Sequence, residues 1–73
     1  MKTENKLIKF SFKDCDYIAK PPRKGKRRLE VYNKGILLAI YRVTDEQLVE
    51  LQNQNYSIRE HFLILKKAES LRR

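Results

Sequence analysis

The sequence predicts an α+β fold, in which a three- to four-stranded antiparallel sheet with a β-hairpin is followed by two C-terminal helices packed on one face. Three observations predict this fold. Apolar and polar residues alternate over residues 7–13, strand formers flank residues 33–35, and helix-capping signatures begin at Thr44 and Ser57. Strand signals precede helix signals, which is typical of α+β domains rather than of alternating α/β domains.

The first strand is expected over residues 7–13, where every second side chain from Ile8 onward is apolar. Residues 14–16, an Asp-Cys-Asp sequence, interrupt the alternation as a turn does. Residues 17–19 are then expected to pair back as a short second strand.

A β-hairpin is expected next, because strand formers at residues 28–32 and 36–43 flank Asn33-Lys34-Gly35. Asn and Gly tolerate the positive φ of tight turns, and a three-residue loop with Gly35 in the left-handed conformation joins such strands. Residues 36–43 carry apolar side chains on both faces. They therefore predict a strand that is central in the sheet or lies at an interface.

The first helix is expected to begin at Thr44, which is a good N-cap and forms a capping box with Gln47. Leu48 and Leu51 give this helix an apolar stripe, and Asn53 ends it.

A second capping box, Ser57 with Glu60, predicts a second helix. Its apolar face is expected to consist of Ile58, Phe62, Leu65 and Ala68. The apolar run at residues 62–65 also fits a last strand, and helix is the preferred interpretation.

The chain is expected to form one small basic domain over residues 1–73. So small a domain buries a limited core, and self-association into a homodimer would add stability. Its longest apolar run, residues 35–41, is too short to span a bilayer, and Lys2 and Glu4 stand where a signal peptide needs apolar residues. With only one cysteine, Cys15, the chain forms no internal disulfide. No membrane association and a cytoplasmic location are the expectations.

Catalysis is not expected, because the residue types that carry it are scarce. His61 is the only histidine and is interpreted as a surface or boundary side chain without a second metal ligand nearby. Cys15 lies between Asp14 and Asp16, which oppose thiolate formation, and is interpreted as a partly buried structural residue. No catalytic residue, metal or cofactor is therefore expected.

The positive charge is concentrated near the N-terminus. The net charge is +8, and the first 28 residues hold ten basic and three acidic residues, a net +7. Residues 20–28 contain six cations and no acid, and Pro21, Pro22 and Gly25 predict an exposed loop. Such a cluster displaces counterions from a phosphate backbone, whereas loops that serve solubility mix both signs.

These features predict a small nucleic-acid-binding accessory or regulatory protein that contacts the phosphate backbone of DNA or RNA. If the first strand and the hairpin strand are adjacent, the sheet extends the basic loop, because its polar face carries two lysines and an aromatic ring. That ring either stacks on an unpaired base or covers the sheet edge. The predicted site consists of Lys20, Arg23, Lys24, Lys26, Arg27 and Arg28 in the loop, and Lys9, Lys13 and Tyr32 on the sheet.

The alternative is a small inhibitor or adaptor that docks on an acidic surface of a larger protein. In that interpretation residues 36–43, or Leu63 and Ile64, form the apolar centre of the contact.

Overall fold

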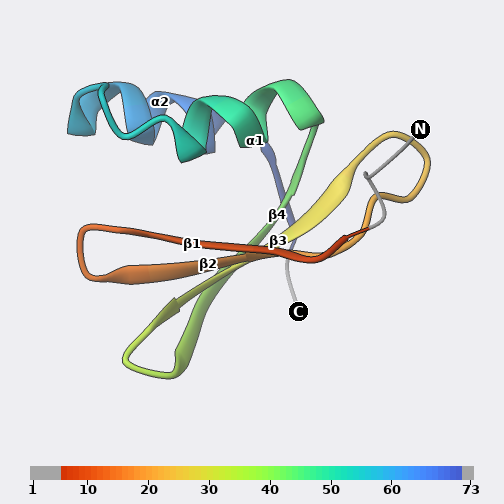
Figure 1. Cartoon of the computed structure of the whole chain (residues 1–73), viewed down its shortest axis with the longest axis horizontal. Helices are drawn as coiled ribbons and strands as arrows, with labels where there is room; N and C mark the ends of the chain where they lie inside the picture. Colours follow the sequence, from red (N-terminus) through yellow and green to blue (C-terminus); the bar gives the residue numbers. More distant parts are fainter. Residues whose placement is uncertain (1–5, 72–73) are drawn as a thin grey trace.

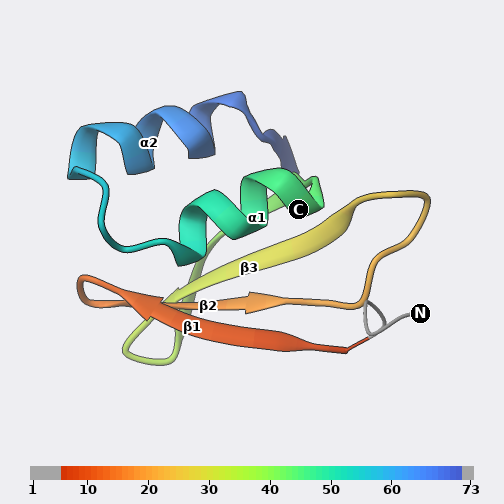
Figure 2. The ribbon, with the colours of Figure 1, turned by 45° about the horizontal axis from the view of Figure 1, so that its top comes forward.

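The computed structural model describes residues 6–71, which form β1 (Ile8–Phe12), β2 (Cys15–Ala19), β3 (Arg27–Asn33), β4 (Ile36–Val43), α1 (Asp45–Gln52), α2 (Ile58–Lys67) and β5 (Glu69–Leu71). Lys2 and Glu4 lie outside the described residues. The strands form one antiparallel sheet in sequence order. Both helices lie on the same face of this sheet, and no described element covers the opposite face (Figure 1, Figure 2). The predicted α+β arrangement is confirmed, with five strands in place of three or four.

The fifth strand was not predicted, and it follows the helices. Residues Glu69–Leu71 pair with Ile40–Arg42 of β4, because α2 carries the chain back over the sheet. Three residues are too few to show an alternation in the sequence. β4 therefore lies between β3 and β5, which confirms the central position that its two apolar faces indicate.

The first turn is shorter than predicted. Lys13 and Asp14 form it, and Lys13 has a φ of 59°. Cys15 and Asp16, expected in the turn, already belong to β2, where they pair with Phe12 and Ser11. The second strand is consequently longer than residues 17–19.

The β3–β4 hairpin is confirmed, but its loop has two residues. Lys34 and Gly35 both have positive φ, 52° and 82°, as a type I′ turn requires, while Asn33 pairs with Ile36. Farther from the turn the register shifts by one residue, because Tyr32 pairs with Leu37 but Val31 pairs with Ala39. This β-bulge leaves Leu38 as the extra residue of β4.

The hydrophobic core lies between the helices and the sheet. It contains Tyr17, Ala19, Leu29, Val31, Val43, Leu48, Leu51, Leu65 and Ala68. Thr44 and Ser57 cap the two helices with complete capping boxes, as predicted, and residues 62–65 are helical.

The buried face of α2 is rotated from the predicted stripe. Phe62 is 63% exposed and Ile58 is 44% exposed, although both were expected to face the core. His61, Leu65 and Ala68 face the core instead, and His61 is only 2% exposed. The interpretation of His61 as a surface or boundary side chain is therefore wrong.

His61 is tolerated in the core because both of its ring nitrogens have partners. The Tyr56 hydroxyl donates to the Leu51 carbonyl at 2.9 Å, so it accepts from His61 Nδ1 at 2.8 Å. The hydroxyl of Tyr17 then donates to Nε2 at 2.5 Å. Phe12 stacks on the imidazole with ring centroids 4.1 Å apart. Burial lowers the pKa of His61, and this arrangement holds the ring neutral.

Candidate nucleic-acid interface

The basic segment folds into a tight turn that is shorter than the predicted loop. Arg27 and Arg28 already belong to β3. The Arg23 amide donates to the Lys26 carbonyl at 2.7 Å, and the Lys26 amide donates back at 3.1 Å. Lys24 and Gly25 form the tip with φ of 54° and 81°. This turn gives the cations around it defined positions.

Arg27 does not lie at the surface with the other predicted contacts. Its side chain is 3% exposed, and its Nε donates to Asp45 Oδ1 at 3.1 Å. Nη1 donates to the carbonyl oxygens of Lys6 at 2.9 Å and Lys20 at 3.2 Å. Arg27 therefore joins the start of α1 to the segments that enter β1 and leave β2, which makes it a structural anchor.

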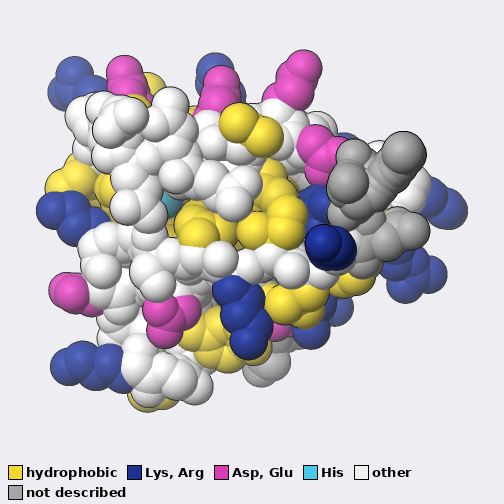
Figure 3. Space-filling model, in the orientation of Figure 1, with side chains coloured by type: hydrophobic (Ala, Val, Ile, Leu, Met, Phe, Trp, Pro, Cys, Tyr) yellow, Lys and Arg dark blue, Asp and Glu magenta, His cyan; other side chains and the backbone are white. Residues whose placement is uncertain are grey.

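A hollow of about 570 Å³ lies beside this turn, between it and the uncovered face of the sheet. Seven cations and one carboxylate are among its lining residues. The lining consists of Lys20, Pro21, Arg23, Lys24, Lys26, Arg27, Arg28, Glu30, Arg42 and Leu71. Figure 3 shows basic side chains gathered at the end of the molecule where the β2–β3 loop projects in Figure 1. We call this feature the basic hollow, and all six predicted loop cations line it.

Arg42 is the lining cation that the sequence did not reveal. It stands directly opposite Arg28 in the β3–β4 register. If the two strands paired without interruption from Asn33 and Ile36 onward, Tyr41 would stand opposite Arg28. Arg42 would then point to the other face of the sheet. The β-bulge at Leu38 shifts the register by one residue and so brings Arg42 into the basic hollow.

Three cations of the basic hollow pair with carboxylates of the chain itself. Arg27 pairs with Asp45 at 3.1 Å, Arg28 with Glu30 at 3.3 Å and Lys26 with Glu69 at 3.7 Å. Arg28 and Lys26 are 56% and 41% exposed, so these two ion pairs are weak and open to exchange.

The positive charge is only partly neutralised by these pairs. Four further cations of the lining make no ion pair with a carboxylate among residues 6–71: Lys20, Arg23, Lys24 and Arg42. Among residues 6–71, the three carboxylates of these pairs are fewer than the seven cations of the lining, so the basic hollow keeps an excess of positive charge.

The structure separates the predicted sheet residues from one another. Lys9 and Tyr32 lie on the uncovered face, but β2 stands between their strands, so β1 and β3 are not adjacent. Lys13 lies in the β1–β2 turn, at the end of the sheet where Asp16 pairs with Tyr32. Arg28 stands at the opposite end of β3. Lys13 is therefore remote from the basic hollow.

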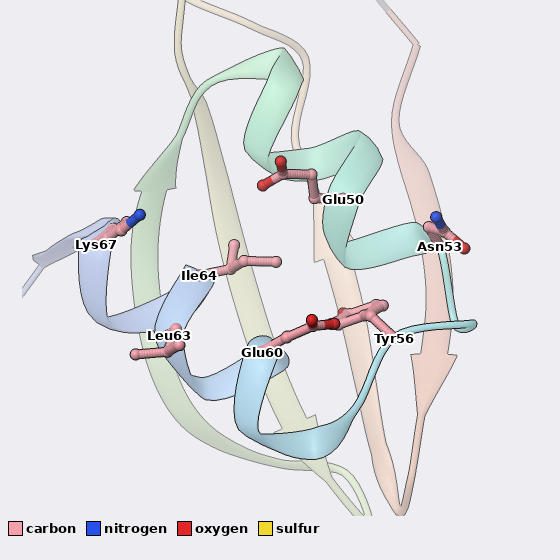
Figure 4. Close-up of a pocket in the computed structure, with 7 residues that line it drawn as sticks. All are labelled: Glu50, Asn53, Tyr56, Glu60, Leu63, Ile64 and Lys67. Atoms are coloured by element: carbon pink, nitrogen blue, oxygen red, sulfur yellow. The ribbon is translucent and has the colours of Figure 1, made fainter.

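A second hollow, of about 380 Å³, lies between the helices and has a different character (Figure 4). Its lining consists of Glu50, Asn53, Tyr56, Glu60, Leu63, Ile64 and Lys67. Two carboxylates and one lysine make it unsuited to a polyanion. Along the helical edge of the molecule in Figure 3, acidic and basic side chains are interspersed. The helices carry side chains of both signs, with Asp45, Glu46 and Glu50 on α1 and Arg59, Lys66 and Lys67 on α2, whereas the segment around the β2–β3 turn is basic.

No known family model, curated protein or solved structure matches this chain. Within residues 6–71, no helix is long and apolar enough to cross a membrane. The same residues contain no group of three or more His, Cys, Asp or Glu side chains that could hold a metal ion. The chemistry of the basic hollow is therefore the ground for a functional proposal.

Proposed function

We propose that this protein binds nucleic acid by holding the phosphate backbone in the basic hollow, as a small accessory or regulatory protein. The observation that carries the proposal is the pair of arginines, Arg28 and Arg42, directly opposite one another beside the basic turn. Like charges at directly opposite strand positions destabilise a sheet. A phosphate between them removes this repulsion and accepts charge-assisted hydrogen bonds from both.

Arg28 can serve a ligand although it pairs with Glu30. The ion pair is made through Nε, which lies 3.3 Å from Glu30 Oε2. A guanidinium has five N–H donors, so both Nη groups stay available for phosphate oxygens. Contacts of this kind fix a backbone in place without reading sequence.

The test compares two variants with the same change in charge. The hollow variant carries Arg23→Gln, Lys24→Gln and Arg42→Gln, and the control variant carries Lys34→Gln, Arg59→Gln and Lys66→Gln. None of the control residues lines the basic hollow. Binding to a random-sequence duplex and single strand is measured by fluorescence anisotropy over a range of salt concentrations.

The hollow variant is expected to bind at least about tenfold more weakly than the wild type. Its slope of log affinity against log salt should fall by about 2 to 3, since each lost phosphate contact removes about 0.7 to 0.9. The control variant should stay within about threefold of the wild type, because it alters only the long-range field. Equal losses in both variants, or none in the hollow variant, would remove the basic hollow from the proposal.

The second candidate function is docking on an acidic surface of a larger protein. Exposed apolar side chains favour it, since Ile36 is 66% exposed, Leu38 58% and Leu63 51%. Ile64 contributes less, because it packs partly against the core. Absence of any nucleic-acid binding by the wild type would favour this candidate. For either function we propose action in the cytoplasm, where a lone cysteine such as Cys15 stays reduced.

A further inference from the structure

The uncovered sheet face carries a connected row of side chains along β3 that begins at the basic hollow. Arg28, Glu30 and Tyr32 are alternate residues and point to the same face. Arg28 Nε lies 3.3 Å from Glu30 Oε2, and the Tyr32 hydroxyl donates to Glu30 Oε1 at 3.0 Å. The side chain of Glu30 is only 12% exposed. One largely buried carboxylate therefore holds both the arginine of the hollow and the tyrosine.

This hydrogen bond determines how the ring of Tyr32 lies. Glu30 is two residues back along β3, a distance of about 7 Å, which is close to the reach of a tyrosine side chain. The ring must therefore lie along the strand instead of standing away from the sheet. The ring remains partly exposed on the uncovered face.

Tyr32 makes no contact with another ring of the described chain. Tyr17 stacks on Phe10, and Tyr56 stacks on Phe12, but no aromatic contact among residues 6–71 involves Tyr32. Tyr32 is thus an aromatic platform that is held in position and unused within the fold.

The surface between the basic hollow and this platform suits the less polar parts of a nucleic acid. Ile18 on β2, opposite Glu30, is partly exposed, and Leu71 on β5 is partly exposed in the lining of the basic hollow. Ile40, which pairs with both Glu30 and Leu71, is only 4% exposed, and Asp16 stands opposite Tyr32 at the far end of the row. Arg28 and Tyr32 are four residues apart, about 13 Å along the strand. A chain of a few nucleotides covers that length.

We propose that the ligand is a single-stranded nucleic acid that lies along β3, with phosphates in the basic hollow and an unpaired base stacked on Tyr32. This inference rests on the function proposed above. Bases offer a free face to an aromatic ring only where they are not stacked within a duplex. A duplex could meet the basic hollow through its phosphates, but it would leave Tyr32 without a base to stack on.

The test uses Tyr32→Leu and its matched control Tyr32→Phe. Leucine keeps apolar bulk on the sheet but removes the ring, whereas phenylalanine keeps the ring and loses only the hydrogen bond to Glu30. Affinities are measured for a single-stranded DNA, a single-stranded RNA of the same sequence and the corresponding DNA duplex. Thermal unfolding of each variant shows that it is folded.

Tyr32→Leu is expected to weaken single-strand binding about tenfold, as the loss of one stacked base does. Tyr32→Phe should stay within about threefold, and neither variant should change the weaker duplex binding. The strand that binds more tightly, DNA or RNA, identifies the natural ligand. A cross-link from an iodouracil-containing single strand, located by mass spectrometry, should fall on Tyr32 of the wild type.

Two results separate this inference from the proposed function. In the first result, the hollow variant loses affinity, the wild type binds duplex as tightly as single strand, and Tyr32→Leu has no effect. The nucleic-acid function then stands, and the single-strand inference is overturned. If the wild type binds none of the three ligands, both proposals fail together.

Discussion

Arg27 shows how a single residue in a charged stretch takes a structural role. Five of its neighbours between Lys20 and Arg28 are cations, yet Arg27 alone in this stretch is buried beneath the turn, where it meets Asp45 and two backbone carbonyls. Burying a guanidinium is favourable only when its donors are satisfied. The basic hollow therefore depends on Arg27, which belongs to its lining but directs its guanidinium to partners within the fold.

Replacing Arg27 with alanine is expected to lower the free energy of unfolding by about 2 to 3 kcal/mol, because Asp45 and two carbonyls lose their donor. Lys24→Ala, at the tip of the same turn, should change it by less than about 0.5 kcal/mol. Urea unfolding of the two variants checks this. Equal stability of both variants would show that Arg27 anchors nothing.

His61 makes stability depend on pH. Burial lowers its pKa in the folded protein below the ordinary value of 6.5, so the unfolded chain takes up the proton first as the pH falls. Stability from this residue is complete above about pH 6.5. It is lost as the pH falls below that value, by at most about 1.4 kcal/mol per pH unit for one proton.

The measurement is an NMR titration of the imidazole ring, which is unambiguous because His61 is the only histidine of the chain. Its midpoint in the folded protein should lie below pH 6.5, and urea unfolding should show falling stability from pH 6.5 to 5.5. A midpoint at or above 6.5 would contradict the neutral, doubly bonded ring.

At the scale of the elements, the starts of both helices depend on contacts between residues that are close together in the sequence. In both helices the N-cap hydroxyl accepts from the backbone amide three residues on, from Gln47 for Thr44 and from Glu60 for Ser57. The side chains of Gln47 and Glu60 accept the N-cap amides in return. Each box needs only four consecutive residues, so the sequence predicts it directly.

Thr44→Ala is expected to destabilise the protein by about 1 kcal/mol, the usual loss for an N-cap. Thr44→Ser keeps the hydroxyl and should cost much less. Thermal or urea unfolding of the pair checks the prediction. A serine variant as unstable as the alanine variant would mean that the methyl group of Thr44, and not its hydroxyl, matters.

Gly35 provides a second prediction for an element. Its φ of 82° suits glycine, and a Cβ at this position meets no atom within 4 Å. Gly35→Ala should therefore cost only backbone strain, about 1 kcal/mol, and Gly35→Asn should cost less, because asparagine tolerates the left-handed region. Unfolding midpoints of the two variants test this order, and an asparagine variant less stable than the alanine variant would contradict it.

At the scale of the whole molecule, the fold leaves one sheet face uncovered and gathers cations at one end of it. The hollow holds seven cations within a chain whose net charge is +8. Such crowding opposes the folded state through repulsion, and a bound polyanion relieves it. Ligand binding and stability are therefore expected to be coupled.

Single-stranded nucleic acid at about 100 times its Kd should raise the free energy of unfolding by about 2.7 kcal/mol, the value for a ligand that binds only the folded state. The hollow variant should show a much smaller rise at the same ligand concentration. Thermal unfolding with and without ligand checks this. An equal rise in both proteins would place the binding site elsewhere.

The sequence by itself determined the features that depend on residues close together in the chain. These are the strand alternation of β1, the β3–β4 hairpin without its exact loop length, both capping boxes, and the concentration of positive charge before Leu29. Strand periodicity and helix capping arise from the geometry of neighbouring residues, so they can be recognised in a short stretch of sequence.

Only the tertiary structure decided which of the charged and polar residues face a ligand. The three-residue β5, the bulge at Leu38 that brings Arg42 opposite Arg28, and the burial of Arg27 and His61 all depend on partners distant in the sequence. Such long-range contacts set the strand register and the buried polar networks. The partner of a buried donor depends on how the chain packs, and it leaves no periodic pattern in the sequence.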